Sequence, residues 1–354
     1  MPTHRYIGLD VHLQSTTVAV VGPSGKRIKS LVVDTTGRSL IEAIKGVPGP
    51  RSICLEEGTQ SEWLAELLEP HAQQLVVFVA ERSRGTKSDE VDAWAMAEKL
   101  RTGALTKHQV FKPGGVLLPL RAAVRSHRMV VDDVVRLKNR LRSLYRSRGL
   151  HETGATMFLP SKRQDWERRL PAPLATTAAT LAIELDALEQ LKTQAEARLE
   201  TEAQRVSIVR RLMTAPAIGV VRAAQIVATV VTPHRFRTKR QFWSYCGLGI
   251  VTRSSADWTR SPDGKLVKMR TFQARGLNGQ RNGQLKLAFK GAAHQICTTM
   301  PSHPLHEHFV RLVEAGTNPK LAKLTIARQL AAAVLAMWKQ QQDYDPAKHS
   351  SPAR

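Results

Sequence analysis

The chain has 354 residues and carries 53 Lys and Arg against 30 Asp and Glu, which gives a formal net charge of +23. A hydrophobic share of 42% is enough to bury a core, so a chain that is disordered throughout is excluded. The apolar runs are strand-sized, which excludes a bilayer span, and so large a positive charge indicates a polyanionic partner, nucleic acid before membrane.

The charge is distributed unevenly along the chain. Residues 1–100 hold 11 Lys and Arg and 13 Asp and Glu, a net charge of −2. Residues 101–354 hold 42 and 17, a net charge of +25. The sequence therefore predicts a weakly acidic front domain attached to a basic remainder that contacts nucleic acid.

The front domain, residues 1–105, is predicted to alternate strands and helices. The runs rich in β-branched residues, which predict strands, are 5–11, 16–21, 28–33, 52–56 and 74–80. The segments with apolar residues at helical spacing are 38–45, 61–68 and 88–102. The order β-β-β-α-β-α-β-α is typical of a mixed sheet with helices packed on its faces.

The middle region, residues 106–212, is predicted to be helical and basic. Its first helix, over 117–149, carries cations that we expect to contact nucleic acid: Arg121, Arg125, Arg128, Arg136, Lys138 and Arg140. A second helix over 174–213 has apolar residues at alternating spacings of four and three, which is typical of a coiled-coil seam. Both an intermolecular coiled coil and a helical hairpin that packs on itself fit this pattern.

The remainder is predicted to be a mainly helical domain over 213–340, followed by a flexible tail over 341–354. A Gly-bearing turn at 215–219 opens a helix that runs to residue 230. Residues 247–283 are predicted to be a polar, basic loop region. Further helices are expected at 285–298, 304–315 and 319–340.

Four acidic residues of the front domain lie where predicted elements begin or end. Asp10 ends the first strand and Glu56 the fourth, so neighbouring strands would bring two carboxylates together, which repel unless a cation neutralises them. Asp89 and Asp92 lie three residues apart at the start of the last helix and share one face. Converging carboxylates are the ligands that Mg²⁺ or Mn²⁺ prefers. The sequence therefore predicts a catalytic metal site made of these four residues.

This arrangement resembles the RuvC-like, ribonuclease-H-type domain of DEDD transposases. The segment 87–93, Lys-Ser-Asp-Glu-Val-Asp-Ala, is similar to the Lys-Thr-Asp-x-x-Asp-Ala signature of the IS110 insertion-sequence family. The family's Glu-Ala-Thr-Gly is Glu-Glu-Gly-Thr here, so Glu56 aligns with the family glutamate and Glu57 is a second candidate. The fold class implied is α/β plus α: a RuvC-like mixed sheet domain, a long coiled-coil-like middle and a mainly helical C-terminal serine domain.

The resemblance extends into the C-terminal region. The segment 247–256 is similar to the family's Gly-Leu-x-Pro element followed by Ser-Gly, with Ile250 in place of the proline and Ala256 in place of the glycine. The family serine falls on Ser255, and Ser254 is the alternative. A serine hydroxyl needs a base, a metal or dense positive charge to act as a nucleophile. The cations of this region that we expect to bind nucleic acid are Arg253, Arg260, Lys265, Arg275 and Arg281.

The resemblance implies a recombinase that excises and inserts a mobile element in the bacterial cytoplasm, associated with the nucleoid while it acts. Its partners would be donor and target DNA and a structured non-coding guide RNA, whose base pairing would select the sites. The carboxylates and the serine would form one composite site between the subunits of a homodimer or a dimer of dimers. A phosphoserine link would conserve the energy of the broken phosphodiester, so strands could be resealed without ATP.

Two other functions stay open. In a metal-dependent, structure-specific endonuclease only the carboxylates would act, and Ser255 would be a turn residue. In a catalytically silent nucleic-acid-binding scaffold neither group would act. The N-terminus has no basic segment followed by an apolar one, and the three cysteines are far apart, so we expect a cytoplasmic protein without structural zinc or a membrane partner.

Overall fold

A computed structural model of the chain describes residues 3–79, 88–107, 109–112, 114–151, 154–254, 258–268 and 272–349. The chain folds as two compact units that divide between Gly114 and Gly115. The first unit extends beyond the boundary expected at residue 105 because the strand β6 (Gln109–Val110) joins its sheet.

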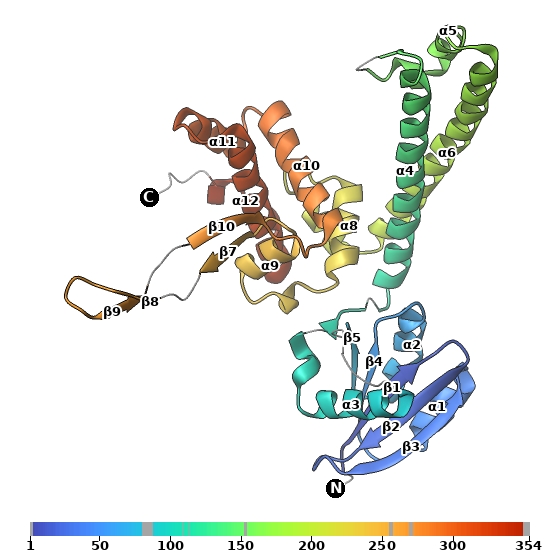
Figure 1. Ribbon diagram of the computed structural model, residues 1–354, viewed down its shortest axis with the longest axis vertical. Coiled ribbons are helices and arrows are strands. Elements are labelled where there is room, and N and C mark those ends of the chain that lie inside the picture. Colours follow the sequence, from blue (N-terminus) through green and yellow to red (C-terminus); the bar gives the residue numbers. More distant parts are fainter. Residues whose placement is uncertain are drawn as a thin grey trace. The chain divides into compact units, whose positions relative to one another are not determined.

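The first unit is built on a six-stranded mixed sheet (Figure 1). Its other strands are β1 (Arg5–Val11), β2 (Ser15–Val21), β3 (Arg27–Asp34), β4 (Arg51–Glu56) and β5 (Gln74–Phe78). The strand order is β3-β2-β1-β4-β5-β6, in which β1 pairs antiparallel with β2 and parallel with β4. The predicted mixed sheet is confirmed, and the order is compatible with a ribonuclease-H-like DEDD domain.

Helices cover both faces of this sheet. They are α1 (Gly37–Lys45), α2 (Ser61–Leu68) and α3 (Asp89–Arg101), close to the three predicted helices. Leu40 of α1 and Leu64 of α2 share a buried cluster with Leu9 of β1. On the opposite face, Met96 of α3 packs with Cys54 of β4. Because strand side chains alternate between the two faces, the even-numbered residues of β1 and β4 face α3.

Gly8 of β1 allows α3 to lie close to the sheet. A Cβ at Gly8 would meet the carbonyl oxygen of Ala93 and would lie 2.7 Å from the amide nitrogen of Ala97, both in α3. The helix begins at a fixed point, since the Ser88 side chain accepts a hydrogen bond from the amide of Val91 at 3.3 Å. This close approach determines where the first turn of α3 lies relative to the end of β1.

The second unit begins with a helical hairpin of α4 (Leu117–Arg146) and α6 (Ala172–Gln204), joined through α5 (Arg163–Glu167) (Figure 1). Leu137 and Leu141 of α4 share a buried cluster with Leu185 of α6. The predicted coiled-coil seam is therefore used within the chain, as in the hairpin alternative.

The predicted continuous helix over 174–213 is wrong, because α6 ends at Gln204 and α7 (Ser207–Leu212) starts anew. Between them Val206 adopts an extended conformation, with φ of −113° and ψ of 102°, and its side chain is buried in the core. The apolar spacing continues through this break, so the pattern alone does not reveal it.

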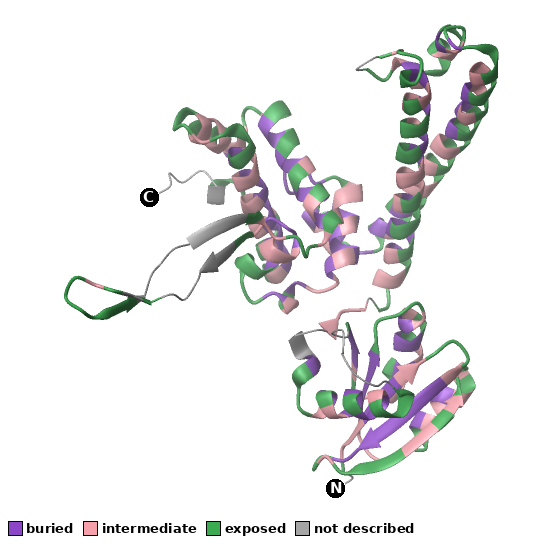
Figure 2. Cartoon of the chain, in the orientation of Figure 1, coloured by how far each residue is buried: buried purple, intermediate pink, exposed green. Residues whose placement is uncertain are grey.

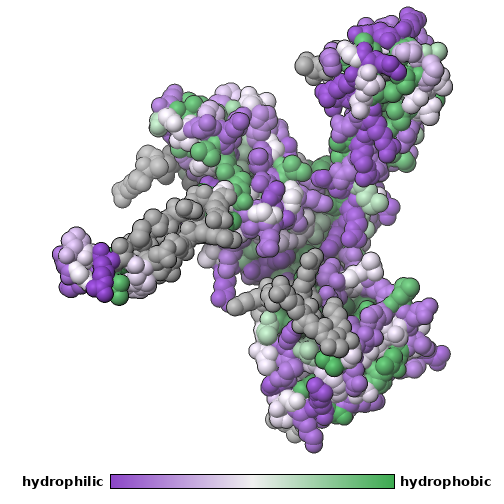
Figure 3. Space-filling view, in the orientation of Figure 1, coloured by the Kyte–Doolittle hydropathy of each residue, from purple (hydrophilic) through white to green (hydrophobic). Residues whose placement is uncertain are grey.

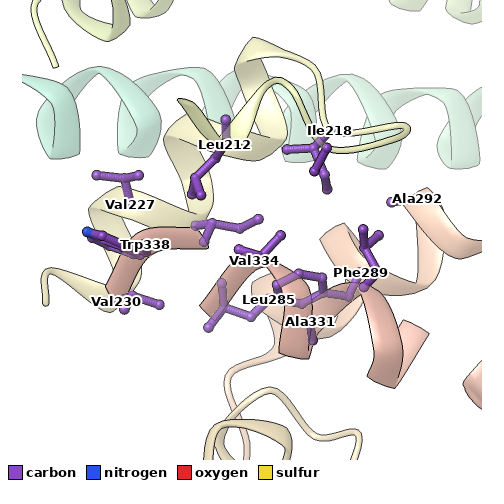
Figure 4. Packing of buried hydrophobic residues seen from close by; sticks show 14 of the residues in the cluster. Leu212, Ile218, Val227, Val230, Leu285, Phe289, Ala292, Ala331, Val334 and Trp338 are labelled. Carbon is purple, nitrogen blue, oxygen red and sulfur yellow. The ribbon is translucent and has the colours of Figure 1, made fainter. Parts of the chain in front are cut away.

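The remaining helices share one large core with the base of the hairpin. They are α8 (Val220–Val230), α9 (Lys239–Tyr245), α10 (Gly283–Thr299), α11 (Pro304–Glu314) and α12 (Pro319–Gln340). Figure 4 shows Val227 of α8, Phe289 of α10 and Trp338 of α12 in this core. Leu120 of α4 and Leu199 of α6 belong to the same cluster, so the hairpin and the C-terminal helices form one unit.

By length and composition alone α12 is long and apolar enough to cross a membrane. The expectation that every apolar run is strand-sized is therefore wrong for this helix. Half of the residues in its most apolar stretch are buried inside the protein, where Ile326, Leu330 and Val334 contribute to the core. This burial is typical of a core helix.

The predicted loop region over 247–283 is wrong, because it contains four strands. They are β7 (Ile250–Ser254), β8 (Trp258–Arg260), β9 (Leu266–Lys268) and β10 (Phe272–Leu277). β7 pairs antiparallel with β10, and β8 pairs antiparallel with β9. The strand residues whose burial is described, such as Ile250, Trp258 and Leu266, are exposed, so the buried and exposed alternation that predicts a strand is weak here.

Part of the predicted tail is attached to the second unit. Tyr344 packs against the large core, and its amide donates a hydrogen bond to the side chain of Thr214 at 2.9 Å. Asp343 forms an ion pair with Arg211 at 3.4 Å. These contacts hold the chain that follows α12.

Candidate active site

The two predicted strand-end carboxylates lie side by side at one edge of the sheet. β1 and β4 run parallel, and Leu9 is paired with Leu55, so Asp10 and Glu56 are the next residues of the two strands. Both belong to the alternating set that faces α3. Asp10 is largely buried, with 18% of its side chain exposed, whereas Glu56 is exposed. The predicted juxtaposition of these strand ends is present in the sheet.

The first turn of α3 adds a third carboxylate, and a histidine lies between it and Asp10. His12 Nε2 lies 3.3 Å from Asp10 Oδ2 and 3.4 Å from Asp89 Oδ1. Asp10, His12 and Asp89 each offer one potential metal-ligating atom, and these three atoms all lie within 4.8 Å of one another. The sequence analysis missed His12, although a metal-binding residue type two positions after Asp10 was a usable signal.

The carboxylates are close enough to affect one another. Burial raises the pKa of Asp10 above its ordinary value; His12 opposes this shift, while the charges of Asp89 and Asp92 add to it. Asp92 therefore acts on Asp10 even though it is not one of the three closely grouped residues. A partly buried carboxylate beside two others is an arrangement that a bound divalent cation stabilises, so this donor set fits a metal.

The two glutamates at the end of β4 have different environments. Glu57 is bound by Lys112, whose Nζ lies 2.6 Å from Glu57 Oε2, and by the hydroxyl of Ser61 at 3.2 Å. The side chain of Glu56 forms no hydrogen bond or ion pair with any residue that the structure describes. It lines a pocket of 140 Å³ together with His12. This difference favours Glu56 over Glu57 as the fourth acidic residue.

The predicted serine region lies on the two-stranded ribbon β7–β10. Ser254 is the last residue of β7 and pairs with Phe272, whereas Ser255 lies outside the described residues. Arg253 pairs with Gln273 in the same ladder, and Arg275 belongs to β10. The ribbon thus brings these two predicted cations into one element with Ser254.

Hydrogen bonds hold the base of this ribbon to the helices. Arg328 of α12 donates from Nε to the carbonyl oxygen of Leu248 at 2.7 Å, and the side-chain amide of Asn278 donates to the carbonyl oxygen of Ser244 in α9 at 3.3 Å. Gly247 has a φ of +67°, and a Cβ there would lie 2.9 Å from Cβ of Arg281. The sequence analysis did not single out Arg328, although an arginine within the apolar pattern of α12 was a signal.

The cations predicted on α4 are partly neutralised within the hairpin. Arg128 pairs with Asp132 at 2.8 Å, Arg136 pairs with Asp133, and Lys138 pairs with Glu189 of α6 at 2.6 Å. Hydrophilic residues nevertheless dominate the visible surface of α4 and α6 (Figure 3). Of these three pairs, the first two lie within α4, whereas Lys138–Glu189 also joins the two helices of the hairpin.

Two regions of the chain match families of known proteins. Residues 7–147 match the family DEDD_Tnp_IS110, described as "Transposase". Residues 209–270 match the "Transposase IS116/IS110/IS902 family". A "Probable family 20 transposase" of Pseudomonas aeruginosa is 28% identical over 227 residues, which cover 60% of this chain and 64% of the relative. The match thus spans less than two thirds of that relative's length.

Proposed function

Because the chain belongs to the IS110 family of transposases, we propose that it is a DNA recombinase that moves an insertion sequence by cleaving and rejoining DNA strands. The observation that carries the proposal is the convergence of Asp10, Asp89 and Glu56 at one edge of the first unit's sheet. The strongly basic second unit supports a polyanionic substrate, since it holds nearly the whole charge surplus.

In this proposal Asp10, Glu56, Asp89 and Asp92 hold Mg²⁺ or Mn²⁺. A divalent cation bound there would polarise the phosphate of the scissile phosphodiester. His12 either joins the donor set or orients the two carboxylates that it contacts. The partial burial of Asp10 limits water around the carboxylate that faces the substrate phosphate.

We propose Ser255, with Ser254 as the alternative, as the nucleophile. Its hydroxyl oxygen attacks the phosphorus and gives up its proton, while the bond from phosphorus to the sugar oxygen breaks and that oxygen leaves as a hydroxyl. A second DNA strand then attacks the phosphoserine with its own hydroxyl, so one phosphodiester replaces another and ATP is not required. Arg253, Arg260 and Lys265 supply positive charge along the same stretch of chain.

The proposed partners are donor and target DNA and a structured guide RNA. Base pairing would select the sites, and the protein would hold nucleic-acid backbones with the cations of its second unit. A composite site of carboxylates from one subunit and a serine from another would require a homodimer or a dimer of dimers. If the purified, salt-washed protein carries no RNase-sensitive absorbance at 260 nm, a stably bound RNA is excluded.

The test is a covalent-adduct assay with DNA from the ends of the element and a divalent cation, supplemented with the RNA encoded beside the gene. Wild-type protein should form a protein–DNA adduct that resists denaturation, and Ser255→Ala should abolish it. Ser254→Ala is the matched control, because its hydroxyl is one residue away. Asp10→Asn should also abolish cleavage while DNA binding is retained.

The alternatives give different results in the same assay. A metal-dependent endonuclease would cleave DNA in the Ser255→Ala variant and would form no adduct. A silent scaffold would bind DNA without cleaving it, and neither substitution would change anything. An adduct that persists in Ser255→Ala but disappears in Ser254→Ala would reassign the nucleophile.

A further inference from the structure

The hairpin formed by β8 and β9 carries apolar side chains that no core covers. Trp258 is 61% exposed, Leu266 is 62% exposed and Val267 is 47% exposed. Figure 2 shows this hairpin almost entirely as exposed surface. These exposed side chains are available for contact with a partner.

The register of the hairpin places two of these apolar side chains and a cation on one face. Arg260 is paired with Leu266, and Trp258 lies two residues before Arg260 in the same strand. Cross-strand partners and residues two positions apart share a face of a β-ladder. Trp258, Arg260 and Leu266 therefore form one face, while Val267 belongs to the other.

The turn between the strands presents a second cation. Both the amide and the hydroxyl of Ser261 donate to the carbonyl oxygen of Lys265, at 2.9 and 3.2 Å. These bonds use the backbone of Lys265 and leave its side chain exposed. Within the part of the chain that the structure describes, neither Lys265 nor Arg260 forms an ion pair. The hairpin thus offers an aromatic ring and two unneutralised cations.

We propose that the β8–β9 hairpin binds a single-stranded segment of DNA beside the cleaved bond, with Trp258 stacked on a base and Arg260 and Lys265 on flanking phosphates. Aromatic rings combined with cations are the means by which proteins hold unpaired strands. DNA is the occupant because Trp258 lies three residues after Ser255, the proposed nucleophile for a DNA phosphodiester, so the inference rests on the proposed function.

The first experiment measures DNA binding without cleavage. The full chain with Ser255→Ala is titrated into a short fluorescent single-stranded oligodeoxynucleotide, at a salt concentration that suppresses nonspecific phosphate contacts. Adding Trp258→Ala should weaken binding by roughly 5- to 100-fold, the usual range for one stacked base, whereas Trp258→Phe should retain most of the affinity. Trp63→Ala, which removes a 41% exposed tryptophan of the first unit, is the matched control and should change nothing.

Two further measurements locate the contact. Arg260→Gln and Lys265→Gln should each lower the salt dependence of binding by about 0.7 in the slope of log K against log salt, as expected for one lost phosphate on a single strand. On irradiation, an iodouracil-substituted oligonucleotide should become crosslinked to the peptide that contains Trp258. Thermal melting of Trp258→Ala should match the parent, because the side chain is outside every core cluster of the described chain.

Unchanged DNA affinity in Trp258→Ala would overturn the proposal, as would a loss confined to an RNA oligonucleotide of the same sequence. The covalent-adduct assay separates this failure from that of the proposed function. If adducts form but Trp258→Ala binds like the parent, only the hairpin assignment is wrong. If Trp258 stacks as expected and no adduct forms with any DNA, only the serine mechanism is wrong.

Discussion

The two units of this chain position their candidate functional residues by different means. In the first unit, Asp10 and Glu56 continue strands whose preceding residues, Leu9 and Leu55, are fully buried. In the second unit, Ser254 ends the strand β7, which pairs with β10 in a two-stranded sheet. Hydrogen bonds at the base of the ribbon, from Arg328 to Leu248 and from the Asn278 side chain to Ser244 of α9, hold it to the helices.

This difference shows how each half of the proposed site gains its geometry. Packing positions the carboxylates before any substrate binds. Their mutual repulsion is unfavourable, and the packing of the surrounding fold offsets it. The ribbon is a two-stranded sheet, and hydrogen bonds from Arg328 and Asn278 at its base determine where its strands leave the helices. We therefore expect a substitution that disturbs the packing of α3 to lower the unfolding free energy of the first unit. A substitution at the base of the ribbon should disturb the local backbone geometry there, at a smaller cost in unfolding free energy.

The largest expected effect is that of Gly8→Ala. The new Cβ would collide with backbone atoms of Ala93 and Ala97, which have no side-chain freedom to move away, so the first unit should lose more than about 3 kcal/mol of unfolding free energy. Calorimetry should show an earlier transition for that unit alone. Gly58→Ala, where a Cβ meets nothing within 4 Å, is the control and should melt close to wild type. Equal melting of the two variants would contradict the close approach of α3.

The second prediction concerns Gly247 at the base of the ribbon. Gly247→Ala combines a positive φ of +67° with displacement of the Arg281 side chain, and should cost about 1–3 kcal/mol in the second unit. Gly316→Ala has a φ of +84° and meets nothing within 4 Å, so it measures the backbone cost alone. In chemical denaturation, the unfolding free energy of Gly247→Ala should be lower than that of Gly316→Ala. If it is not lower, the Arg281 side chain moves aside without an energetic cost.

The third prediction is a pH effect on the first unit. Because burial raises the pKa of Asp10, the folded state holds this proton more tightly than the unfolded chain does. Stability is therefore lost as the pH rises from the ordinary pKa through the raised one, and it stays lower at neutral pH. Asp10→Asn should melt at a higher temperature than wild type at neutral pH in EDTA, and the difference should shrink in acid.

The matched control for this effect is Asp34→Asn, an exposed acid at the end of β3. It should leave the melting temperature nearly unchanged. Mg²⁺ or Mn²⁺ should raise the melting temperature of wild type but not that of Asp10→Asn, because ligand binding to the folded state stabilises it. A wild-type protein that is the more stable of the two in EDTA would show that burial of this carboxylate is not unfavourable.

The part of the fold that the sequence predicts is the part governed by local patterns. The strands and helices of the first unit follow from alternating or helical spacing, and Asp10 and Glu56 from their places at strand ends. The strands β7 to β10 were not foreseen, because the described apolar residues of β8 and β9 are exposed and β7 pairs with a strand that lies beyond that hairpin in the chain. The position of His12, two residues after Asp10, was a usable local signal, but its contact with Asp89 depends on where Gly8 allows α3 to lie, which no local pattern contains.

The smallest predicted effect is a gain in stability at the turn before α8. Ala217 has a φ of +56°, and Arg222 donates to its carbonyl oxygen at 2.7 Å. An L-residue in this conformation costs about 1–2 kcal/mol, and the greater freedom of glycine in the unfolded chain offsets about 0.4–1 of that. Ala217→Gly should therefore raise the unfolding free energy of the second unit by about 0.5–1 kcal/mol.

Ala122→Gly, at an exposed position within α4, should instead lower the unfolding free energy by about 1 kcal/mol, because glycine disfavours a helix. The two Ala-to-Gly changes are chemically identical, so opposite signs in denaturant unfolding can arise only from backbone conformation. If both destabilise, the turn before α8 does not require its left-handed residue. If Ala217→Gly raises the unfolding free energy and Ala122→Gly lowers it, glycine is favoured at the α8 turn because of its φ. Gly8 is needed for a different reason, since a Cβ there would collide with α3.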